Sequence, residues 1–426
     1  MSLRTGLLDL RPLRASPAYR RLWGSGVLAA LGGQVVVVAV LFEVWDLTHD
    51  PVWTGAIGLA HAIPLIIFGL IGGTLADGVD RRTLVRWTTV GQAAAGVGLA
   101  AQALAGIGSL WLVLGLVAAQ GAAGALGAPA RRTFIPRLLA PELVGAGIAL
   151  QHLTFQAAML VGPAVGGLII GRWGVAACYG AYAVATLVSL YGVIRLPSMR
   201  PEGNATRPGV RSTIEGFGYV FRRPVLRGSF ASDLAATLLS MPIALFPLVN
   251  EIRFGGNPET LGLFLSCIAV GGIGAGLFSG LVTRVDRPGP VQLGAAAVWG
   301  LALATFGLAG PLWLALLVLV VAGAADTVSV LSRGLMIQLA TPDSHRGRVS
   351  SVDHIVGVAG PDVGNFRAGL VAGATSAPVA LVSGGLACAA LVGVVAVRNR
   401  PLRTFSIRTG AGVEREPVGE ETRAES

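Results

Sequence analysis

The sequence of 426 residues contains no lysine, only three cysteines and little charge of either sign. Charged residues make up 13% of the chain, whereas a soluble domain carries about 25%. Together with 53% hydrophobic residues and a mean hydropathy of +0.71, this scarcity excludes a soluble globular protein and indicates a membrane protein. All three cysteines (Cys178, Cys267 and Cys388) fall in apolar runs, which argues against a disulfide framework or a metal cluster.

Signatures of catalysis are also missing. No HExxH, Gly-x-Ser-x-Gly or Cys/His grouping occurs, so neither a nucleophile–base pair nor a metal-ligand set can be assembled from the sequence. Residues 1–21 are polar and Arg-rich, without the apolar core of a cleavable signal. We therefore expect a protein that is not an enzyme and that binds no cofactor or metal.

Long runs without charge dominate what is present. Residues 87–130 contain no ionisable side chain, and as a helix they would extend roughly 66 Å, twice the ~30 Å hydrocarbon core. This run is therefore two crossings, joined at the turn-like sequence of residues 106–109. The same reasoning along the whole chain predicts twelve transmembrane helices, at 22–46, 53–76, 83–106, 109–131, 143–171, 174–196, 226–250, 259–283, 289–308, 311–333, 350–373 and 376–397.

The distribution of arginine predicts the orientation. With both termini in the cytoplasm, 29 of the 32 arginines fall on the inner side, which is the positive-inside pattern. Arg172 and Arg253 fall outside, and Arg367 lies within a span. The net charge of +10 therefore reflects topology and not nucleic-acid binding. We expect a multi-pass protein of the inner (plasma) membrane, in contact with the lipid bilayer and monomeric.

The polar segments divide the chain. We predict a cytoplasmic N-terminal segment (1–21), an N-terminal six-helix bundle (22–196), a cytoplasmic linker (197–225), a C-terminal six-helix bundle (226–397) and a cytoplasmic tail (398–426). The halves echo each other, because GPAVGG at 162–167 returns as GPDVGN at 360–365. Such echoes at matching places indicate an internal duplication of the transporter kind, with two bundles related by pseudo-symmetry.

Two motifs carry a resemblance to a known family. GGTLADGVDRR at 72–82 resembles the loop motif between helices two and three of the major facilitator superfamily, with matches at Gly73, Asp77, Arg81 and Arg82. In that family the motif is a gate, and Asp77 can face the N-terminus of helix eleven, where the helix dipole favours a carboxylate. Gly78 and Asp80 depart from the family pattern. The alternative interpretation is an ordinary positive-inside turn.

GPAVGG in helix five is similar to the antiporter motif of the same superfamily, with matches at Gly162, Pro163, Gly166 and Gly167. Proline bends a helix and glycines allow close contact with a neighbour. In the family this motif accompanies export. Over nearly the whole chain, further stretches resemble the branch of enterobactin exporters and macrolide-efflux-like proteins: SPAYRRLW, LFEVWDLT (41–48), PARRTFIPRLL (129–139) and NFRAG (365–369). The family's helix-four arginine is Val117 here.

Ionisable residues inside spans are functional candidates, because a charge at mid-bilayer costs at least ~2.5–3.5 kcal/mol. We predict two groups, since helices one, four, seven and ten line the cavity in this family. The proton-coupling candidates are Asp233, Asp362, Arg367 and Asp326, and the substrate-cavity candidates are Gln34, Glu43, His61 and Gln120. Plainer interpretations remain, such as an outer-interface position for Glu43, hydrogen-bonding helix contacts for His61, and a structural Asp233–Arg367 pair. Arg333 is expected at the cytoplasmic end of helix ten.

These residues and the resemblance predict a function. We expect a secondary active transporter that exports an amphipathic small molecule, a siderophore or a drug-like compound, by alternating access with proton antiport. We expect Arg367 to pair with a carboxylate on another helix and Asp362 to remain free to titrate. The alternatives are an uncoupled facilitator, a lipid flippase on the same fold, or a non-transporting membrane sensor.

Overall fold

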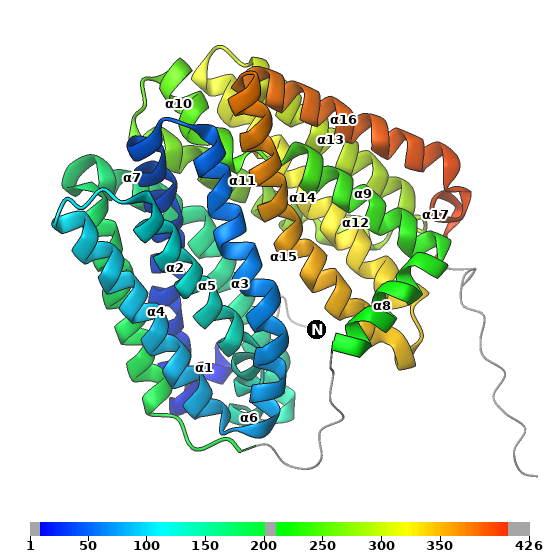
Figure 1. Cartoon of the computed structure of the whole chain (residues 1–426). Helices are drawn as coiled ribbons and strands as arrows, with labels where there is room; N and C mark the ends of the chain where they lie inside the picture. The colour runs from blue at the N-terminus through cyan, green and yellow to red at the C-terminus, as the bar shows by residue number, and fades with distance from the viewer. Residues whose placement is uncertain (1–8, 201–209, 408–426) are drawn as a thin grey trace, which may run out of the picture.

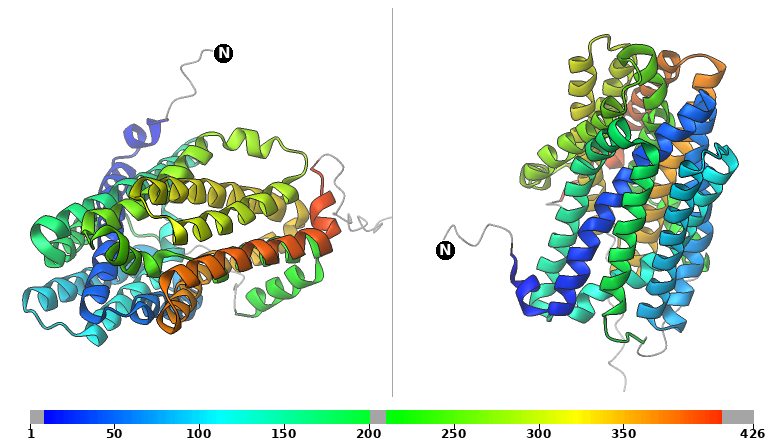
Figure 2. Two further views of the ribbon diagram at one scale, coloured as in Figure 1. Left: turned by 90° about the horizontal axis from the view of Figure 1, so that it is seen from above. Right: turned by 90° about the vertical axis from the view of Figure 1, so that its left-hand side faces the viewer.

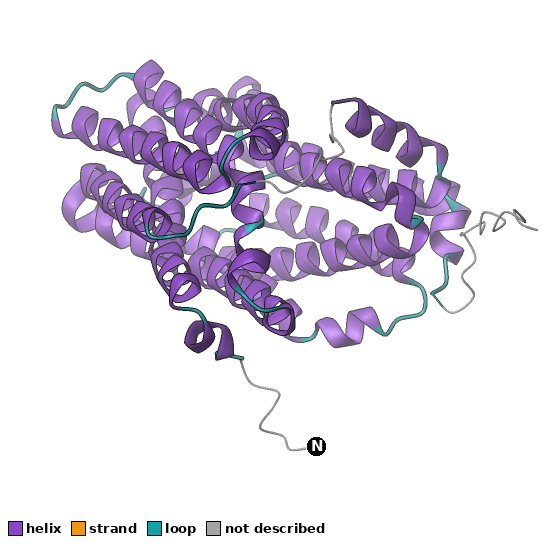
Figure 3. Cartoon of the chain, turned by 90° about the horizontal axis from the view of Figure 1, so that it is seen from below, coloured by secondary structure: helices purple, strands orange, loops and turns teal. Residues whose placement is uncertain are grey.

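The computed structural model describes residues 9–200 and 210–407, and every regular element among them is a helix (Figure 3). The all-helical fold class predicted from the sequence is therefore confirmed for the described residues. The first half, blue to green in Figure 1, contains α1 (Arg11–Ala15), α2 (Pro17–Thr48), α3 (Pro51–Gly78), α4 (Arg81–Leu104), α5 (Leu110–Arg132), α6 (Phe134–Leu138) and α7 (Pro141–Ile194).

The second half, green to red in Figure 1, begins inside the segment predicted as a linker. Its elements are α8 (Val210–Arg222), α9 (Pro224–Ser240), the 3-10 turn η2 (Ile243–Leu245), α10 (Phe246–Phe254), α11 (Pro258–Leu277), α12 (Ser279–Thr283), α13 (Pro288–Leu308), α14 (Leu312–Ala340), α15 (Asp343–Ala374), α16 (Ala377–Arg398) and α17 (Arg400–Thr404). The predicted tail thus begins with a short helix, and residues 408–426 lie outside the described part.

Local sequence sets many helix ends. Ser16 caps α2 through its hydroxyl, which accepts a hydrogen bond from the backbone N–H of Tyr19 at 3.2 Å, and Pro17 occupies the first turn. In the turn predicted at residues 106–109, Gly106 and Gly108 adopt φ of 61° and 59°, a region that favours glycine. The turn therefore forms where the run without charge has to reverse direction.

One element contains two of the predicted helices with a break between them, and another predicted helix is interrupted. α7 has 54 residues, but Gly174 inside it has φ 77°, between the predicted helices 143–171 and 174–196. The predicted helix 226–250 is interrupted at Met241 and Pro242 and continues as η2 and α10. Proline has no backbone N–H, so the α-helical hydrogen-bond pattern fails at this point.

The predicted end of helix ten is wrong. α14 continues to Ala340, seven residues beyond the expected end at 333. Arg333 therefore does not lie at the end of its helix. Its side chain is buried inside the second half, with 5% of the residue exposed.

Length and composition are consistent with repeated membrane crossing. Of the helical stretches in the described residues, nine are long and apolar enough to cross a membrane, and one of them is the 54-residue α7. α4 and α15, which the sequence predicts as crossings, are not among the nine. The total of twelve crossings remains a prediction.

The two bundles stand side by side and touch along α3 with α15 and along α7 with α11 (Figures 1 and 2). Within the second half, Phe246, Phe264 and Phe306 form an aromatic cluster with ring centroids 5.4–5.5 Å apart. Edge-to-face contacts of this kind are specific in geometry. They join α10, α11 and α13.

Candidate functional site

Glycines allow the two halves to touch backbone to backbone. A side-chain carbon at Gly58 of α3 would overlap the backbone of Asp362 on α15, and one at Gly369 of α15 would overlap Pro51 of α3. Thr54 adds a hydrogen bond from its hydroxyl to the carbonyl of Ala244 at 2.8 Å. On the orientation that the arginines predict, this is the outer end, and the described contacts hold it closed.

The GPAVGG segment lies in the other contact between the halves, that of α7 with α11. Gly162 packs against Gln34 and Gly166 against Val35, so this face of α7 lies directly on α2. Gly167 faces the backbone of Glu259 at the start of α11, which belongs to the other half. The predicted close helix contact at the glycines is therefore present. Gln34, predicted to line the substrate cavity, instead packs against Gly162.

The GPDVGN segment makes the matching contacts in the second half. Gly360 and Gly364 of α15 pack against Thr237 of α9, and Asp362 meets Gly58 of α3. α7 thus packs on α2 and α11, while α15 packs on α9 and α3. The repeated motif marks the same packing relation in each half.

A cavity of about 460 Å³ lies between the halves, lined by residues of α2, α3, α4, α5, η2 and α15. Its walls are mostly apolar, and its size is in the range of small-molecule pockets. The polar residues that line it are Thr54, His61, Gln92, Gln120, Arg132, His354, Asp362 and Asn365. Two predicted cavity residues, His61 and Gln120, are among them.

His61 and Asp362 join the halves inside this cavity. His61 Nδ1 lies 2.8 Å from Asp362 Oδ2, with side-chain exposures of 43% and 19%. α3 supplies the imidazole and α15 the carboxylate. The sequence predicted that Asp362 is free, but its carboxylate is paired with a residue 301 positions earlier.

The predicted partner of Arg367 is wrong. Its guanidinium Nη1 donates to the backbone carbonyl of Leu239 on α9, and among residues 9–200 and 210–407 no carboxylate lies within ion-pair distance of it. Leu239 lies just before the break at Met241 and Pro242, where helical carbonyls lose their normal partners. Arg367 therefore supports an interrupted helix, and Asp233 does not pair with it.

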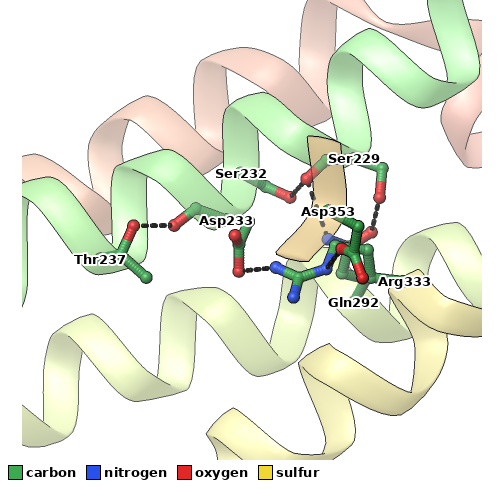
Figure 4. A network of polar contacts seen from close by, with 7 residues as sticks. All are labelled: Ser229, Ser232, Asp233, Thr237, Gln292, Arg333 and Asp353. Atoms are coloured by element: carbon green, nitrogen blue, oxygen red, sulfur yellow. Dashed lines mark hydrogen bonds and ion pairs between the residues drawn. The ribbon is translucent and has the colours of Figure 1, made fainter. Parts of the chain in front are cut away.

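Asp233 instead belongs to a buried ionic network (Figure 4). Arg333 of α14 contacts Asp233 of α9 through Nη1, and its Nε lies 3.0 Å from Asp353 Oδ1 of α15. The side chains of Arg333 and Asp233 are 7% and 8% exposed. Asp326 lies about two helical turns before Arg333 on α14 and is exposed. Two carboxylates therefore share one guanidinium and join three helices of the second half.

Neutral groups complete this network. Ser229 donates its hydroxyl to Gln292 Oε1 at 2.7 Å, and Gln292 Nε2 donates to the Ser229 carbonyl at 3.0 Å (Figure 4). Both residues are fully buried. This reciprocal pair ties α9 to α13 beside the charged groups.

Glu43 lies away from the central cavity. Its carboxylate is buried, with 7% of the residue exposed, and it accepts hydrogen bonds from Gln102 Nε2 at 2.6 Å and from the Tyr179 hydroxyl. Glu43 therefore connects α2, α4 and α7 within the first half. It does not line the central cavity; it lines another pocket, beside the turn at Gly106 and Gly108.

The residues of the predicted gate occupy the end of α3 and the start of α4. Gly73 and Asp77 lie in α3. The Asp77 side chain, and with it the predicted contact with helix eleven, lies outside the described part of the structure. Arg81 donates its backbone N–H to the Met199 carbonyl at 3.1 Å. Arg82 Nη1 donates to the Leu196 carbonyl at 2.8 Å. In this structure both arginines secure the segment after α7 in their own half.

Asp80 lies directly before α4, and its carboxylate accepts several hydrogen bonds. Partial burial alone would raise its pKa, but hydrogen bonds from the Ser198 hydroxyl and from the backbone N–H groups of Thr83, Met199 and Arg82 lower the pKa below its ordinary value. Asp80 is thus an N-cap that also holds the segment after α7.

Sequence reasoning missed two residues that face each other across the cavity. Arg132 of α5 has Nη2 3.2 Å from Nε2 of His354 on α15. From the sequence, Arg132 is only one of the inner-side arginines, and His354 is only part of the predicted helix 350–373. The signal that could have found them is the position of Arg132 directly after 109–131, a helix predicted to line the cavity.

A family model described as transmembrane secretion effector matches residues 9–417. The chain belongs to this family, within the major facilitator superfamily. It is 27% identical over 387 residues to the enterobactin exporter EntS of Shigella boydii serotype 18, covering 90% of this chain and 92% of the relative. The EntS of Escherichia coli O81 is 26% identical over the same shares.

Solved structures show the fold. The nucleoside transporter NupG has a TM-score of 0.72 at 13% identity, covering 89% of this chain and 99% of its own. A bacterial homologue of the iron transporter ferroportin, in an inward-facing state, has a TM-score of 0.66 at 17% identity, covering 89% and 98%. The family member described here is therefore a multi-pass membrane transporter and not an enzyme.

Proposed function

We propose that this transporter exports an amphipathic small molecule of the siderophore class across the inner membrane by alternating access, in exchange for protons. The observation that carries the proposal is the cavity between the halves, closed at its predicted outer end and crossed by the His61–Asp362 pair. The relatives named as enterobactin exporters support a siderophore-like substrate.

The closed end supports an inward-facing state. Gly58 and Gly369 bring α3 and α15 into backbone contact there, and Asn365 Oδ1 accepts a hydrogen bond from the Ala244 N–H at 3.0 Å. An outward-facing state requires these contacts to separate. Substrate would then leave through the opened end, and the glycines would meet again when it closes.

The His61–Asp362 pair can couple this movement to protons. When His61 is protonated, its hydrogen bond to the Asp362 carboxylate is charge-assisted and about twice as strong as a neutral one. A proton taken up outside would therefore favour closure of the outer end. Loss of that proton to the cytoplasm weakens the pair, and substrate binding can then return the transporter to the outward-facing state.

Proteoliposomes loaded with a siderophore-like substrate test the proposal. We expect His61→Gln and Asp362→Asn each to abolish efflux driven by a pH gradient while downhill exchange of substrate continues. Gln156→Ala, a neutral change in α7 outside the central cavity, serves as the control. Undiminished pH-driven efflux in both variants would exclude this pair as the coupling site, and efflux that never responds to pH would favour an uncoupled facilitator.

A further inference from the structure

A pocket of about 580 Å³ lies beside the turn between α4 and α5, at the outer end that the arginines predict. We call it the outer acidic pocket. Residues of α2, α4 and α7 line it, and Pro258 at the start of α11 adds a contact from the other half. None of its described lining residues also lines the central cavity, so the two spaces are separate.

Acidic side chains give the outer acidic pocket a negative charge. Glu43 and Asp46 of α2 line it, and Asp46 is exposed. A side-chain carbon at Gly171, which also lines the pocket, would overlap the carboxylate of Glu259 on α11, so this third carboxylate lies at the edge of the pocket. Among the described residues of the lining, none is basic. The pocket therefore attracts cations from the outer solution.

Glu43 is the buried member of this group. Only 7% of the residue is exposed, and its carboxylate accepts hydrogen bonds from two neutral donors, Gln102 and Tyr179. No basic residue in the described ranges forms an ion pair with it. Asp233 shows the contrast, because the guanidinium of Arg333 compensates its charge. A buried carboxylate without a counter-charge is costly, and a bound cation would remove that cost.

Gln102 adds an oxygen that has no partner. Its Nε2 donates to Glu43 Oε1 at 2.6 Å, but in the described part of the structure its Oε1 accepts no hydrogen bond, although only 2% of the residue is exposed. Turning the amide over does not solve this, because Oε1 would then face the carboxylate. A buried amide oxygen without a donor is costly. A cation in the pocket is a partner for both this oxygen and the Glu43 carboxylate.

We propose that the outer acidic pocket binds a hard metal cation, one that prefers oxygen ligands, through the Glu43 carboxylate and Gln102 Oε1. Each carboxylate oxygen has two lone pairs, so the cation adds to the hydrogen bonds from Gln102 and Tyr179 and does not replace them. Carboxylate and amide oxygens are ligands of Ca²⁺, and Na⁺ is likewise held by oxygens. Thiolate and imidazole ligands, which suit zinc and copper, do not occur among the described lining residues.

The lack of a Cys/His grouping in the sequence predicted no metal site. The donors here are instead oxygens from α2 and α4, 59 positions apart in the chain, and only the packing of these helices brings them together. The inference does not depend on proton exchange at His61 and Asp362, which lie in the central cavity.

Melting temperatures of the purified full-length protein in detergent test the assignment. CaCl₂ and NaCl are titrated separately into metal-free buffer, with choline chloride keeping the ionic strength constant. We expect one of the two salts to raise the melting temperature saturably, and Glu43→Gln to weaken the apparent Kd by about 10–100-fold. In metal-free buffer Glu43→Gln should melt no lower than the wild type, because it keeps the side-chain length and removes an uncompensated buried charge.

Two further variants complete the test. Gln102→Met removes the amide oxygen and should also weaken the response to the cation. Glu142→Gln removes an exposed carboxylate in the first turn of α7 and should keep the wild-type response. A wild type that neither salt stabilises, or an equal response in Glu43→Gln and Glu142→Gln, would overturn the assignment. A much lower melting temperature of Glu43→Gln in metal-free buffer would also overturn it, since Glu43 would then stabilise the fold without a cation.

Discussion

Replacing Arg333 by methionine should destabilise the second half more than any other single neutralisation in it. Methionine keeps much of the side-chain length and removes the charge. Asp233 and Asp353 would then face each other without the cation that lies between them (Figure 4). Asp233 lies on α9 and Asp353 on α15, so the repulsion between their carboxylates acts directly on the packing of these two helices.

The magnitude follows from burial and distance. Arg333 and Asp233 are 7% and 8% exposed, and the Arg333–Asp353 separation is 3.0 Å. At an effective dielectric constant of about 20, unit charges roughly 3 Å apart attract by about 5 kcal/mol. Desolvation offsets much of this in the intact pair, but removing one partner of a buried pair costs about 3–5 kcal/mol. Asp353 is 33% exposed, so Asp233 contributes the larger share of the loss.

Thermal unfolding in a single detergent provides the assay. We expect Arg333→Met to have the lowest melting temperature and Asp233→Asn a smaller decrease, because Arg333 then still has Asp353. The double variant should be more stable than Arg333→Met alone, since Asp233 no longer carries an uncompensated charge. Arg86→Met, an exposed arginine, is the control. A melting temperature of Arg333→Met equal to that control, or additive losses in the double variant, would refute the reasoning.

Three further predictions follow from the packing and the hydrogen bonds. Gly58→Ala should reduce efflux, because overlap of the added methyl group with α15 costs about 1–3 kcal/mol in the closed state. Gly69→Ala is the control, since nothing lies within 4 Å of that position, and it should leave efflux unchanged. Equal efflux in the two variants would contradict the role of the contact. Tyr179→Phe removes a donor from the buried Glu43 carboxylate and should cost about 1–3 kcal/mol, measured as a lower melting temperature. The pKa of Asp80 is lower in the folded protein than its value near 3.8 in the unfolded chain. Its carboxylate therefore stabilises the fold at pH values above 3.8, and this contribution is lost as the pH falls through the lower pKa of the folded protein. The melting temperatures of wild type and Asp80→Asn should therefore differ at neutral pH and converge in acid; a constant difference would refute this.

The sequence determined the helices because their signals are local. Uncharged runs, N-caps such as Ser16 and turn glycines such as Gly106 act within a few residues, and the structure places helices close to the predicted ranges. The GPAVGG segment also predicted close packing, since glycine permits it wherever a neighbouring helix lies. The misplaced end of helix ten shows the limit, because α14 remains helical beyond its apolar part.

Only the tertiary structure decided which charges meet. Asp362 pairs with His61, Asp233 with Arg333, and Arg367 with a carbonyl at a helix break. Each choice depends on how far neighbouring helices are rotated about their axes and shifted along them. Those two quantities come from the packing of whole faces, and no short stretch of sequence encodes them. The same holds for Arg131 and Arg132, which are adjacent in the chain but line different cavities.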